Sequence, residues 1–486
     1  MAAFVLTISL GALMLVPCCL KRGGPTARLI AAPFSRHSGA GSIPSARMLA
    51  SGGGGSGAAA ASSAEQRGRY VSSIEDAAAS LRAGGLVAFP TETVYGLGAH
   101  AFDADAVASI FTVKGRPRSD PLIVHVPSPE AAEELVRLDD DGLAVMRQLA
   151  AAFWPGPLTL VARACPELPP AVTAGTGFVG VRCPAHARAT ELLRAAGVPV
   201  AAPSANRFGH VSPTKPEHVM DDLGGHEIMV LLPSPTPSPS SAAAACDVGI
   251  ESTVLKVDGE AKELLLLRRG GVPEAELARW LAAHAATTFG YTMRVQPPKH
   301  SAPPPVESGQ GQQQQQQQPA SVETPAPHAG TEEAQIAPGM LLTHYAPDLP
   351  SFLLELCDGA GGTEAAAGAL GFPVEKAVVL DYGARLAHLR KSALAYRDLS
   401  SAADASEAAT VVFDALRWAE GCASEGATCV LLPDVASPSA QTPQPSGSGG
   451  ASDDHAPALA DRLYRAASGR SARLTEDGVS IVVNAE

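Results

Sequence analysis

The sequence predicts an α/β protein built from two globular segments. Short apolar runs with the length of buried strands alternate with stretches of helical periodicity, a pattern typical of strands and helices that share a sheet. The 486 residues are enough for two or three domains with cores of their own. Glycine (47) and proline (41) exceed average usage, and many of them lie in low-complexity stretches, so part of the chain is predicted to be linker.

The N-terminal segment has no acidic residue. Residues 1–64 carry five Lys and Arg side chains among Ser, Ala and Gly, a composition typical of organellar transit peptides. We therefore expect residues 1–70 to be a disordered leader that directs the protein to a mitochondrion or plastid, with the cytoplasm as the alternative. The apolar run 2–20 leaves a membrane anchor open, and Met48 leaves open a dispensable segment ahead of it.

Residues 71–290 form the first predicted domain. A helix is expected to begin at Ser128, because Pro129 at the first helical position and Glu130 behind it are a typical N-terminal signature. Residues 233–245 are rich in Pro and Ser and predict a disordered surface insertion. The expected strands are 86–89, 122–126, 158–161, 179–182, 198–202, 228–232, 252–257 and 264–267.

Residues 291–349 predict a linker, because they hold seven consecutive glutamines at 312–318 and several prolines. A second, small α/β domain is expected over 350–486, with a disordered loop at 437–454. Its expected elements are strands at 377–381 and 429–432 and helices at 402–420 and 458–467.

Charge and cysteine content exclude two broad classes of protein. The formal net charge of −13 has the wrong sign for a protein that holds nucleic acid over its whole surface, so any phosphate binding must be local. None of the eight cysteines forms the C-x-x-C pair of a zinc knuckle or redox site. We interpret them as reduced thiols, and no protein-bound metal site is predicted.

The block from Phe89 to Gly98 (FPTETVYGLG) is a polar turn directly after a buried strand. Hydroxyls and a carboxylate just past a strand end are typical of the ligand site of an α/β sheet. A glycine-rich turn with Thr and Glu as caps is the alternative.

Three cations follow at the end of an amphipathic helix, at Lys114, Arg116 and Arg118. They either complement the helix dipole or form a phosphate clamp, because Lys and Arg both bind phosphate oxygens by charge-assisted hydrogen bonds. The next strand ends on His125, a position at which a histidine is more often structural than catalytic.

Later motifs repeat the placement of polar groups at strand ends. Ser204 and Asn206 end a strand of small residues, Ser252 begins one within GIEST, and Arg268 follows a run of four leucines. Their oxygens and nitrogens are suited to contact ribose, phosphate or carboxylate groups.

Taken in order, these motifs resemble the YrdC/Sua5 family of L-threonylcarbamoyladenylate synthases, whose hallmark is K-x-R followed far downstream by S-x-N. Here these are Lys114-Gly-Arg116 and Ser204-Ala-Asn206. The resemblance also takes in PTETVYGLG, DPLIVH, FWPGPLT, VRCP, GIEST and LLRRGG. PGMLLTHYAP at 338–347 resembles the linker of Sua5-type members, and ADRLYRAA the closing helix of their second domain. The resemblance implies a YrdC-like twisted mixed sheet with helices around a concave site, and a Rossmann-like Sua5 domain.

The resemblance also implies a reaction: L-threonine, bicarbonate or CO2, and ATP with Mg2+ give threonylcarbamoyl-AMP and pyrophosphate. The product would pass to a threonylcarbamoyl transferase that acts on adenosine 37 of tRNA, with no stable nucleic-acid binding and no membrane association expected of this chain. By motif position, Lys114 and Arg116 would be catalytic. The threonine side would be Thr93, His125, Arg182, Ala202 and Ser252. The ATP side would be Arg116, Asp120, Ser204, Asn206, Ser212, Arg268 and Tyr345.

Two positions depart from the family pattern. Asp120 stands where many members have Asn or Lys, and Phe178 stands where Thr is common, so Phe178 can offer ATP only its backbone. A double-stranded RNA-binding module without catalysis is the alternative function. A carbamoyl-transfer enzyme of hydrogenase maturation is disfavoured, because such enzymes carry the C-x-x-C pairs that are missing here.

Overall fold

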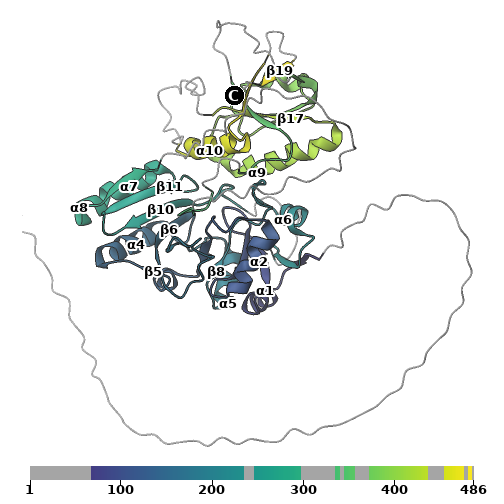
Figure 1. Ribbon diagram of the computed structural model, residues 1–486. Helices are drawn as coiled ribbons and strands as arrows, with labels where there is room; N and C mark the ends of the chain where they lie inside the picture. The colour runs from purple at the N-terminus through teal and green to yellow at the C-terminus, as the bar shows by residue number, and fades with distance from the viewer. Residues whose placement is uncertain are drawn as a thin grey trace, which may run out of the picture. The chain divides into compact units, whose positions relative to one another are not determined.

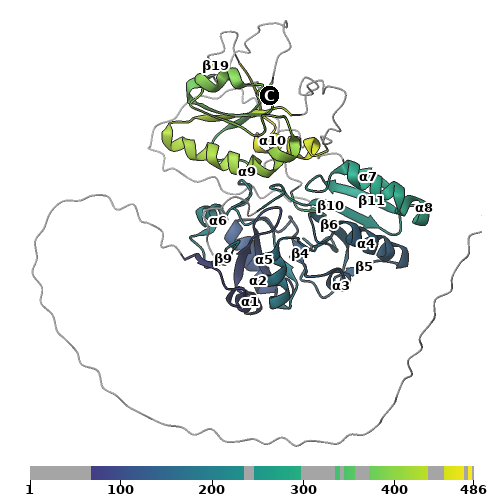
Figure 2. The same cartoon turned by 180° about the vertical axis from the view of Figure 1, so that it is seen from behind.

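The computed structural model describes residues 67–234, 246–296, 334–339, 344–355, 371–435, 454–474 and 480–483. Residues 235–245 of the expected insertion (233–245), most of the leader and linker, and most of the loop 437–454 lie outside these ranges. Figures 1 and 2 show the described elements from opposite sides.

The N-terminal part is a mixed 12-stranded sheet, ordered β1-β9-β2-β3-β8-β4-β7-β6-β10-β11-β12 with β5 paired to β6. The sheet contains both parallel pairs, such as β4/β7, and antiparallel pairs, such as β2/β3. This confirms the twisted mixed sheet with helices. The strands are β1 (Arg69–Val71), β2 (Leu86–Phe89), β3 (Gly96–His100), β4 (Ile123–His125), β5 (Val136–Arg137), β6 (Leu158–Ala164), β7 (Phe178–Arg182), β8 (Val200–Ala201), β9 (Ile228–Leu231), β10 (Thr253–Asp258), β11 (Glu263–Arg268) and β12 (Thr292–Val295).

The helices that cover this sheet begin and end at residues suited to those positions. Asp103 caps the helix α2, its carboxylate accepting hydrogen bonds from the backbone of Asp105 and Ala106. Gly115 ends α2 in the left-handed conformation, with φ +65°, and turns the chain directly behind Lys114. The helices are α1 (Ile74–Arg82), α2 (Ala104–Lys114), α3 (Pro129–Glu133), α4 (Asp140–Phe153), α5 (Ala187–Ala196), α6 (Pro216–Leu223), α7 (Glu274–Ala283) and α8 (Ala285–Phe289).

The C-terminal part is a 7-stranded sheet, ordered β14-β19-β18-β13-β17-β15-β16. Its central strands are parallel, as expected of a Rossmann-like domain, and α9 and α10 pack on it. The elements are β13 (Ser351–Leu354), β14 (Gly371–Pro373), β15 (Ala377–Asp381), β16 (Ala395–Asp398), α9 (Ala405–Gly421), β17 (Cys429–Pro433), α10 (Ala456–Ala466), β18 (Ser471–Leu474) and β19 (Ser480–Val483), with short 3-10 turns at Val374–Lys376, Ala387–Lys391 and Cys422–Glu425.

One apolar cluster joins the two sheets. Val94, Val211 and Ile250 come from loops of the N-terminal part, and they pack in the same cluster as Phe413 of α9 and Leu463 of α10. The loops that carry the conspicuous motifs are therefore covered by the C-terminal part instead of by water. Burial of these side chains favours the contact between the two parts.

The expected strands and helices are confirmed, with one error and two extensions. The block 89–98 is not one turn, because Gly96–His100 forms β3 between β2 and β8. Glycines seldom favour a strand, but a side chain at Gly98 would clash with Val200 and Phe89, so close packing requires glycine there. β1 and β12 take in residues of the expected leader and linker, because each adds a parallel partner at a sheet edge.

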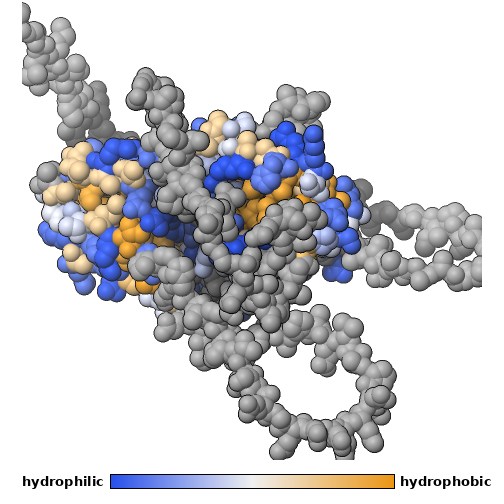
Figure 3. Space-filling model, turned by 90° about the horizontal axis from the view of Figure 1, so that it is seen from above, coloured by the Kyte–Doolittle hydropathy of each residue, from blue (hydrophilic) through white to orange (hydrophobic). Residues whose placement is uncertain are grey.

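The exposed surface and the cysteines of the described ranges agree with what the composition predicts. In Figure 3, hydrophilic residues lie between the hydrophobic areas of the face shown. In the described ranges the large hydrophobic side chains that are exposed are Tyr70 and Phe102, and no helix there is long and apolar enough to span a bilayer. The five cysteines within those ranges are all free and buried.

Candidate functional site

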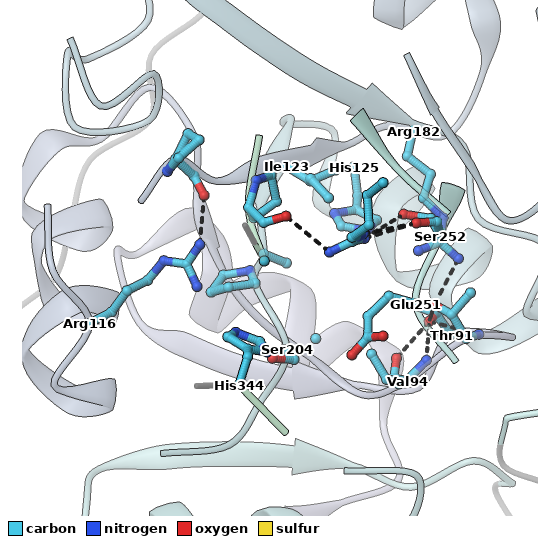
Figure 4. Close-up of a pocket in the computed structure, with 18 of the residues that line it drawn as sticks. Thr91, Val94, Arg116, Ile123, His125, Arg182, Ser204, Glu251, Ser252 and His344 are labelled. Carbon is cyan, nitrogen blue, oxygen red and sulfur yellow. Dashed lines mark hydrogen bonds between the residues drawn. The ribbon is translucent and has the colours of Figure 1, made fainter. Parts of the chain in front are cut away.

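A pocket lies where the motif loops meet Pro338, Gly339, His344 and Tyr345 (Figure 4). Its walls come from β4, β7, the turn before β3, the loop after β8, the start of β10 and the end of β11. The lining residues are Thr91, Thr93, Val94, Gly96, Arg116, Pro121, Ile123, His125, Arg182, Ala202, Pro203, Ser204, Glu251, Ser252, Arg268, Pro338, Gly339, His344 and Tyr345.

Arg182, the last residue of β7, organises one side of the pocket. Its Nη2 donates to Glu92 Oε1 at 2.8 Å and to Thr93 Oγ1 at 2.9 Å, and its Nε donates to the Gly156 carbonyl at 3.2 Å. Glu92 also accepts from the Ala185 amide at 3.0 Å. The guanidinium is only 4% exposed, so its charge acts in a medium that screens it weakly.

His125 closes the deep end of the same side. Its ring packs edge-on against Phe89 at 5.9 Å between centroids. Burial, reinforced by the charge of Arg182, lowers the pKa of His125 to about 3, so the imidazole is neutral at physiological pH. Its Nδ1 has no hydrogen-bond partner among the described residues. A neutral ring with an open nitrogen can contact a substrate without adding charge.

The hydroxyl groups pair with each other and not with a histidine. Thr91 Oγ1 and Thr93 Oγ1 are 2.8 Å apart, and so are Thr159 Oγ1 and Ser252 Oγ. Among the described residues, none of these four hydroxyls is hydrogen-bonded to a histidine or lysine that could take its proton. The arrangement therefore suits the positioning of two substrates better than covalent catalysis.

Arg268, at the end of β11, also lines the pocket. Its Nη2 donates to the Ser252 carbonyl at 2.9 Å and to Ser252 Oγ at 3.2 Å, and its Nη1 reaches the Pro338 carbonyl at 3.3 Å. Gly339 has φ +80°, and a Cβ there would lie 3.1 Å from Arg268 Nη1 and 3.2 Å from the Tyr345 hydroxyl. Glycine is thus required where this segment crosses the pocket.

The two cations of the K-x-R motif have different surroundings. Lys114 Nζ donates to the carbonyls of Ser204, at 2.7 Å, and Asn206, so it holds the loop after β8 and does not line the pocket. Arg116 lines the pocket and forms an ion pair with Asp120 at 2.9 Å. Burial lowers the pKa of both groups, most strongly for Lys114.

Tyr345, which precedes the C-terminal part of the chain, lines the pocket. Its backbone is left-handed, with φ +63°, which is uncommon for a residue other than glycine. Its ring lies 4.1 Å from the ring of His344 and 5.3 Å from that of Phe413. Burial and the nearby Glu251 raise the pKa of Tyr345 to about 12, so the hydroxyl keeps its proton, and it has no hydrogen-bond partner in the described part of the chain.

Nine of the predicted site residues line this one pocket, and four support it from behind. The nine are Thr93, Arg116, His125, Arg182, Ala202, Ser204, Ser252, Arg268 and Tyr345. The four are Lys114, described above, Asp120, which pairs with Arg116, Asn206, whose Nδ2 donates to the carbonyls of Arg207 and His210, and Ser212, whose Oγ donates to Glu251 at 2.6 Å.

Several residues of the site were not identified from the sequence. Glu92 and Glu251 lie within the quoted PTETVYGLG and GIEST motifs, but their partners, Arg182 and Arg462, are distant in the chain. Thr91 and His344 also stand inside quoted motifs and were not singled out. For these four residues, the signal in the sequence that could have identified them was a polar side chain inside a motif. For Arg462 the sequence offered only its place in the segment ADRLYRAA.

Phe178 lies outside the pocket. The Nζ of Lys256 is 4.5 Å from the centre of its ring, and the guanidinium carbon of Arg163 is 5.5 Å away. The side chain therefore serves as a packing surface for two cations, Arg163 on the adjacent strand β6 and Lys256 on β10 beyond it.

One group of side chains has the spacing of metal ligands, namely His210, Asp348 and Glu420. Each of these three side chains already has a hydrogen-bond or ion-pair partner among the described residues. His210 Nε2 lies 3.0 Å from Glu420, the other ring nitrogen lies 2.8 Å from Asp222, and Asp348 pairs with Arg207. We interpret the group as a polar contact between the two parts of the chain.

Two sequence families match the chain in consecutive segments. The family described as "Telomere recombination" (Sua5_yciO_yrdC) matches residues 79–270, and the family described as "Threonylcarbamoyl-AMP synthase, C-terminal domain" matches residues 311–468.

Individual relatives agree with these matches. The chain is 37% identical over 288 residues to the threonylcarbamoyl-AMP synthase of Bacillus subtilis (59% of this chain, 67% of that protein). It is 43% identical over 206 residues to the Pyrococcus abyssi enzyme of that name, but these span 56% of that protein and 42% of this chain. A putative threonylcarbamoyl-AMP synthase of Mycobacterium tuberculosis is 38% identical over 46% of this chain and 95% of its own length.

A solved structure extends the likeness to both parts of the chain. The crystal structure of P. abyssi Sua5 complexed with L-threonine matches with a TM-score of 0.58 and 29% identity. The match covers 84% of this chain and 99% of that one.

Proposed function

Because the chain belongs to the Sua5/YrdC family, we propose that it is an L-threonylcarbamoyladenylate synthase. It forms threonylcarbamoyl-AMP and pyrophosphate from L-threonine, bicarbonate or CO2, and ATP. The observation that carries the proposal is a single pocket lined both by Arg182, His125 and Thr93 and by Arg116 and Arg268. Such a pocket can hold two anionic substrates next to each other.

The chemistry follows from positioning. The threonine amine adds to CO2 and loses a proton to give a carbamate. A carbamate oxygen then forms a bond to the α-phosphorus of ATP, the bond to the bridging oxygen breaks, and pyrophosphate leaves. Arg182 would bind the threonine carboxylate, and Arg116 and Arg268 would stabilise negative charge on the phosphates. No protein nucleophile takes part, in agreement with the paired hydroxyls described above.

Mg2+ is expected to enter with ATP. Glu251 is the only carboxylate among the described lining residues, and Arg462 already neutralises it at 3.1 Å. The described lining residues therefore offer no cage of carboxylates for the ion, and the phosphates of ATP are its expected ligands.

The double-stranded RNA-binding alternative is not favoured. Lys114, Arg116, Arg182 and Arg268 are each less than a tenth exposed, so they are not available to a duplex at the surface. The net charge of −13 opposes counterion-driven binding elsewhere.

Two further expectations belong to this proposal. The product is handed to a threonylcarbamoyl transferase acting on tRNA, and residues 1–64 direct the chain to a mitochondrion or plastid. Fusion of residues 1–64 to a fluorescent protein tests the second expectation. A diffuse cytoplasmic signal would refute it.

The reaction is tested by pyrophosphate release from the purified full chain. Release should require ATP, threonine and bicarbonate together, and Lys114→Ala or Arg116→Ala should abolish it. Arg118→Ala is the matched control, because Arg118 is an exposed cation two residues further along. Pyrophosphate release without threonine, or none under any condition, would refute the proposal.

A further inference from the structure

Arg462 connects the C-terminal part of the chain to the pocket. It lies on α10 and is completely buried. Its Nε is 3.1 Å from Glu251 Oε2, its Nη1 is 3.1 Å from Asp461 Oδ2, and its guanidinium carbon is 5.5 Å from the centre of the Tyr345 ring. A residue of the second domain thus touches two residues that line the pocket, without lining it itself.

Glu251 depends on this contact for charge compensation. Ser212 donates to its Oε1 and Arg462 to its Oε2, so each domain holds one oxygen of the carboxylate. A buried carboxylate that loses its cationic partner is strongly unfavourable. It would also repel the threonine carboxylate and, more strongly, the phosphates of ATP, which carry more negative charge.

Tyr345 depends on the same guanidinium for its position. Arg462 and Phe413 both pack against the ring, Phe413 with its own ring 5.3 Å away. This packing holds a residue whose backbone, at φ +63°, is costly for a side chain with a Cβ. The Tyr345 hydroxyl, which has no partner in the described part of the chain, is thereby kept beside Gly339 and Arg268.

We propose that Arg462 is a positioning residue for the ATP side of the pocket, through which the C-terminal domain completes the active site. It neutralises Glu251 and fixes the ring of Tyr345. That the substrate is ATP rests on the proposed function, whereas the role of Arg462 rests on contacts within this chain. The second domain thereby takes part in substrate binding indirectly, through Glu251 and Tyr345.

The test compares Arg462→Met and Arg462→Lys with the wild-type full chain. Methionine keeps much of the apolar stem but removes the charge, so KM for ATP should rise at least about 10-fold, with a smaller change in KM for threonine. Lysine keeps the charge but not the planar stack on Tyr345, so it should give an intermediate value. Arg473→Met is the matched control, because Arg473 pairs with Glu355 in the same domain and is 52% exposed.

A double variant separates charge compensation from a merely structural role. Adding Glu251→Gln to Arg462→Met removes the buried carboxylate together with its partner, and should recover part of the lost ATP affinity. If the single methionine variant does not fold, as judged by circular dichroism, Arg462→Lys and the double variant provide the comparison. An ATP KM equal to wild type in the folded Arg462 variants, or no recovery in the double variant, would overturn the proposal.

Calorimetric titration measures ATP binding without the reaction, so it tests the role of Arg462 separately from the proposed function. If the wild type releases pyrophosphate and Arg462→Met binds ATP equally well, the inference fails and the proposed function stands. If the wild type releases none, weaker ATP binding by Arg462→Met still supports the role of Arg462, and equal binding still refutes it.

Discussion

Replacing Arg182 with glutamine removes the pocket-lining guanidinium that we assign to the threonine carboxylate. The side chain is 4% exposed and donates to Glu92, Thr93 and the Gly156 carbonyl at 2.8 to 3.2 Å. We expect two separable effects, one on threonine binding and one on folding.

The binding effect follows from the loss of a charge-assisted hydrogen bond to the substrate carboxylate. Such bonds contribute about 1.5 to 3 kcal/mol, so KM for threonine should rise roughly 10- to 150-fold while KM for ATP changes much less. The folding effect follows from Glu92, which keeps the Ala185 amide but loses its cation. Breaking a buried ion pair costs about 3 to 5 kcal/mol, and glutamine, which can still donate, should lie near the lower end.

Pyrophosphate release at varied threonine concentration measures the first effect, and thermal unfolding by circular dichroism measures the second. A double change, Arg182→Gln with Glu92→Gln, should regain stability without regaining threonine affinity. Arg147→Gln is the control, because Arg147 also pairs with a glutamate, Glu133, through two hydrogen bonds, but is 58% exposed, and its loss should leave both readouts nearly unchanged. An unchanged threonine KM in Arg182→Gln would show that the carboxylate is bound elsewhere.

Three other predictions follow from the described contacts. Lys114→Met removes the donor that joins two carbonyls of the loop after β8, so it should lower the thermal midpoint as well as activity; a loss of activity at unchanged stability would indicate direct substrate contact instead. Tyr345→Phe deletes only the unpartnered hydroxyl, so ATP affinity by calorimetry should fall about 3- to 10-fold with no loss of stability; equal affinity would mean that only the ring matters. Burial disfavours protonation of His210, but hydrogen bonds to Asp222 and Glu420 outweigh it and raise the pKa of His210. This stabilisation is complete below the unfolded pKa of about 6.5 and is lost as the pH rises through the higher folded value. His210→Asn should therefore lower the thermal midpoint more at pH 6 than at pH 9, and an equal decrease at both would refute the argument.

The elements that could be predicted are those whose signal is local. β2 and β15 have the predicted bounds, because each is a continuous apolar run that is buried on both faces. β3 could not be predicted in this way. Its glycines lack strand propensity, and it exists because β2 and β8 pair with it from either side.

The features of the site also differ in whether the sequence or the tertiary structure determines them. The residue types and their order along the chain, from Lys114 and Arg116 through Arg182 to Arg268, are properties of the sequence, and they sufficed to indicate the family, whose resemblance implied the substrates. Which of those cations faces the pocket was decided by the tertiary structure. Lys114 turns to the backbone carbonyls behind it, whereas Arg116 lines the cavity. Glu251 and Arg462 are 211 residues apart, and only folding brings them within 3.1 Å. Burial and ion pairing determine whether a charged side chain binds substrate or supports the wall of the pocket. Both depend on neighbours that are distant in the chain.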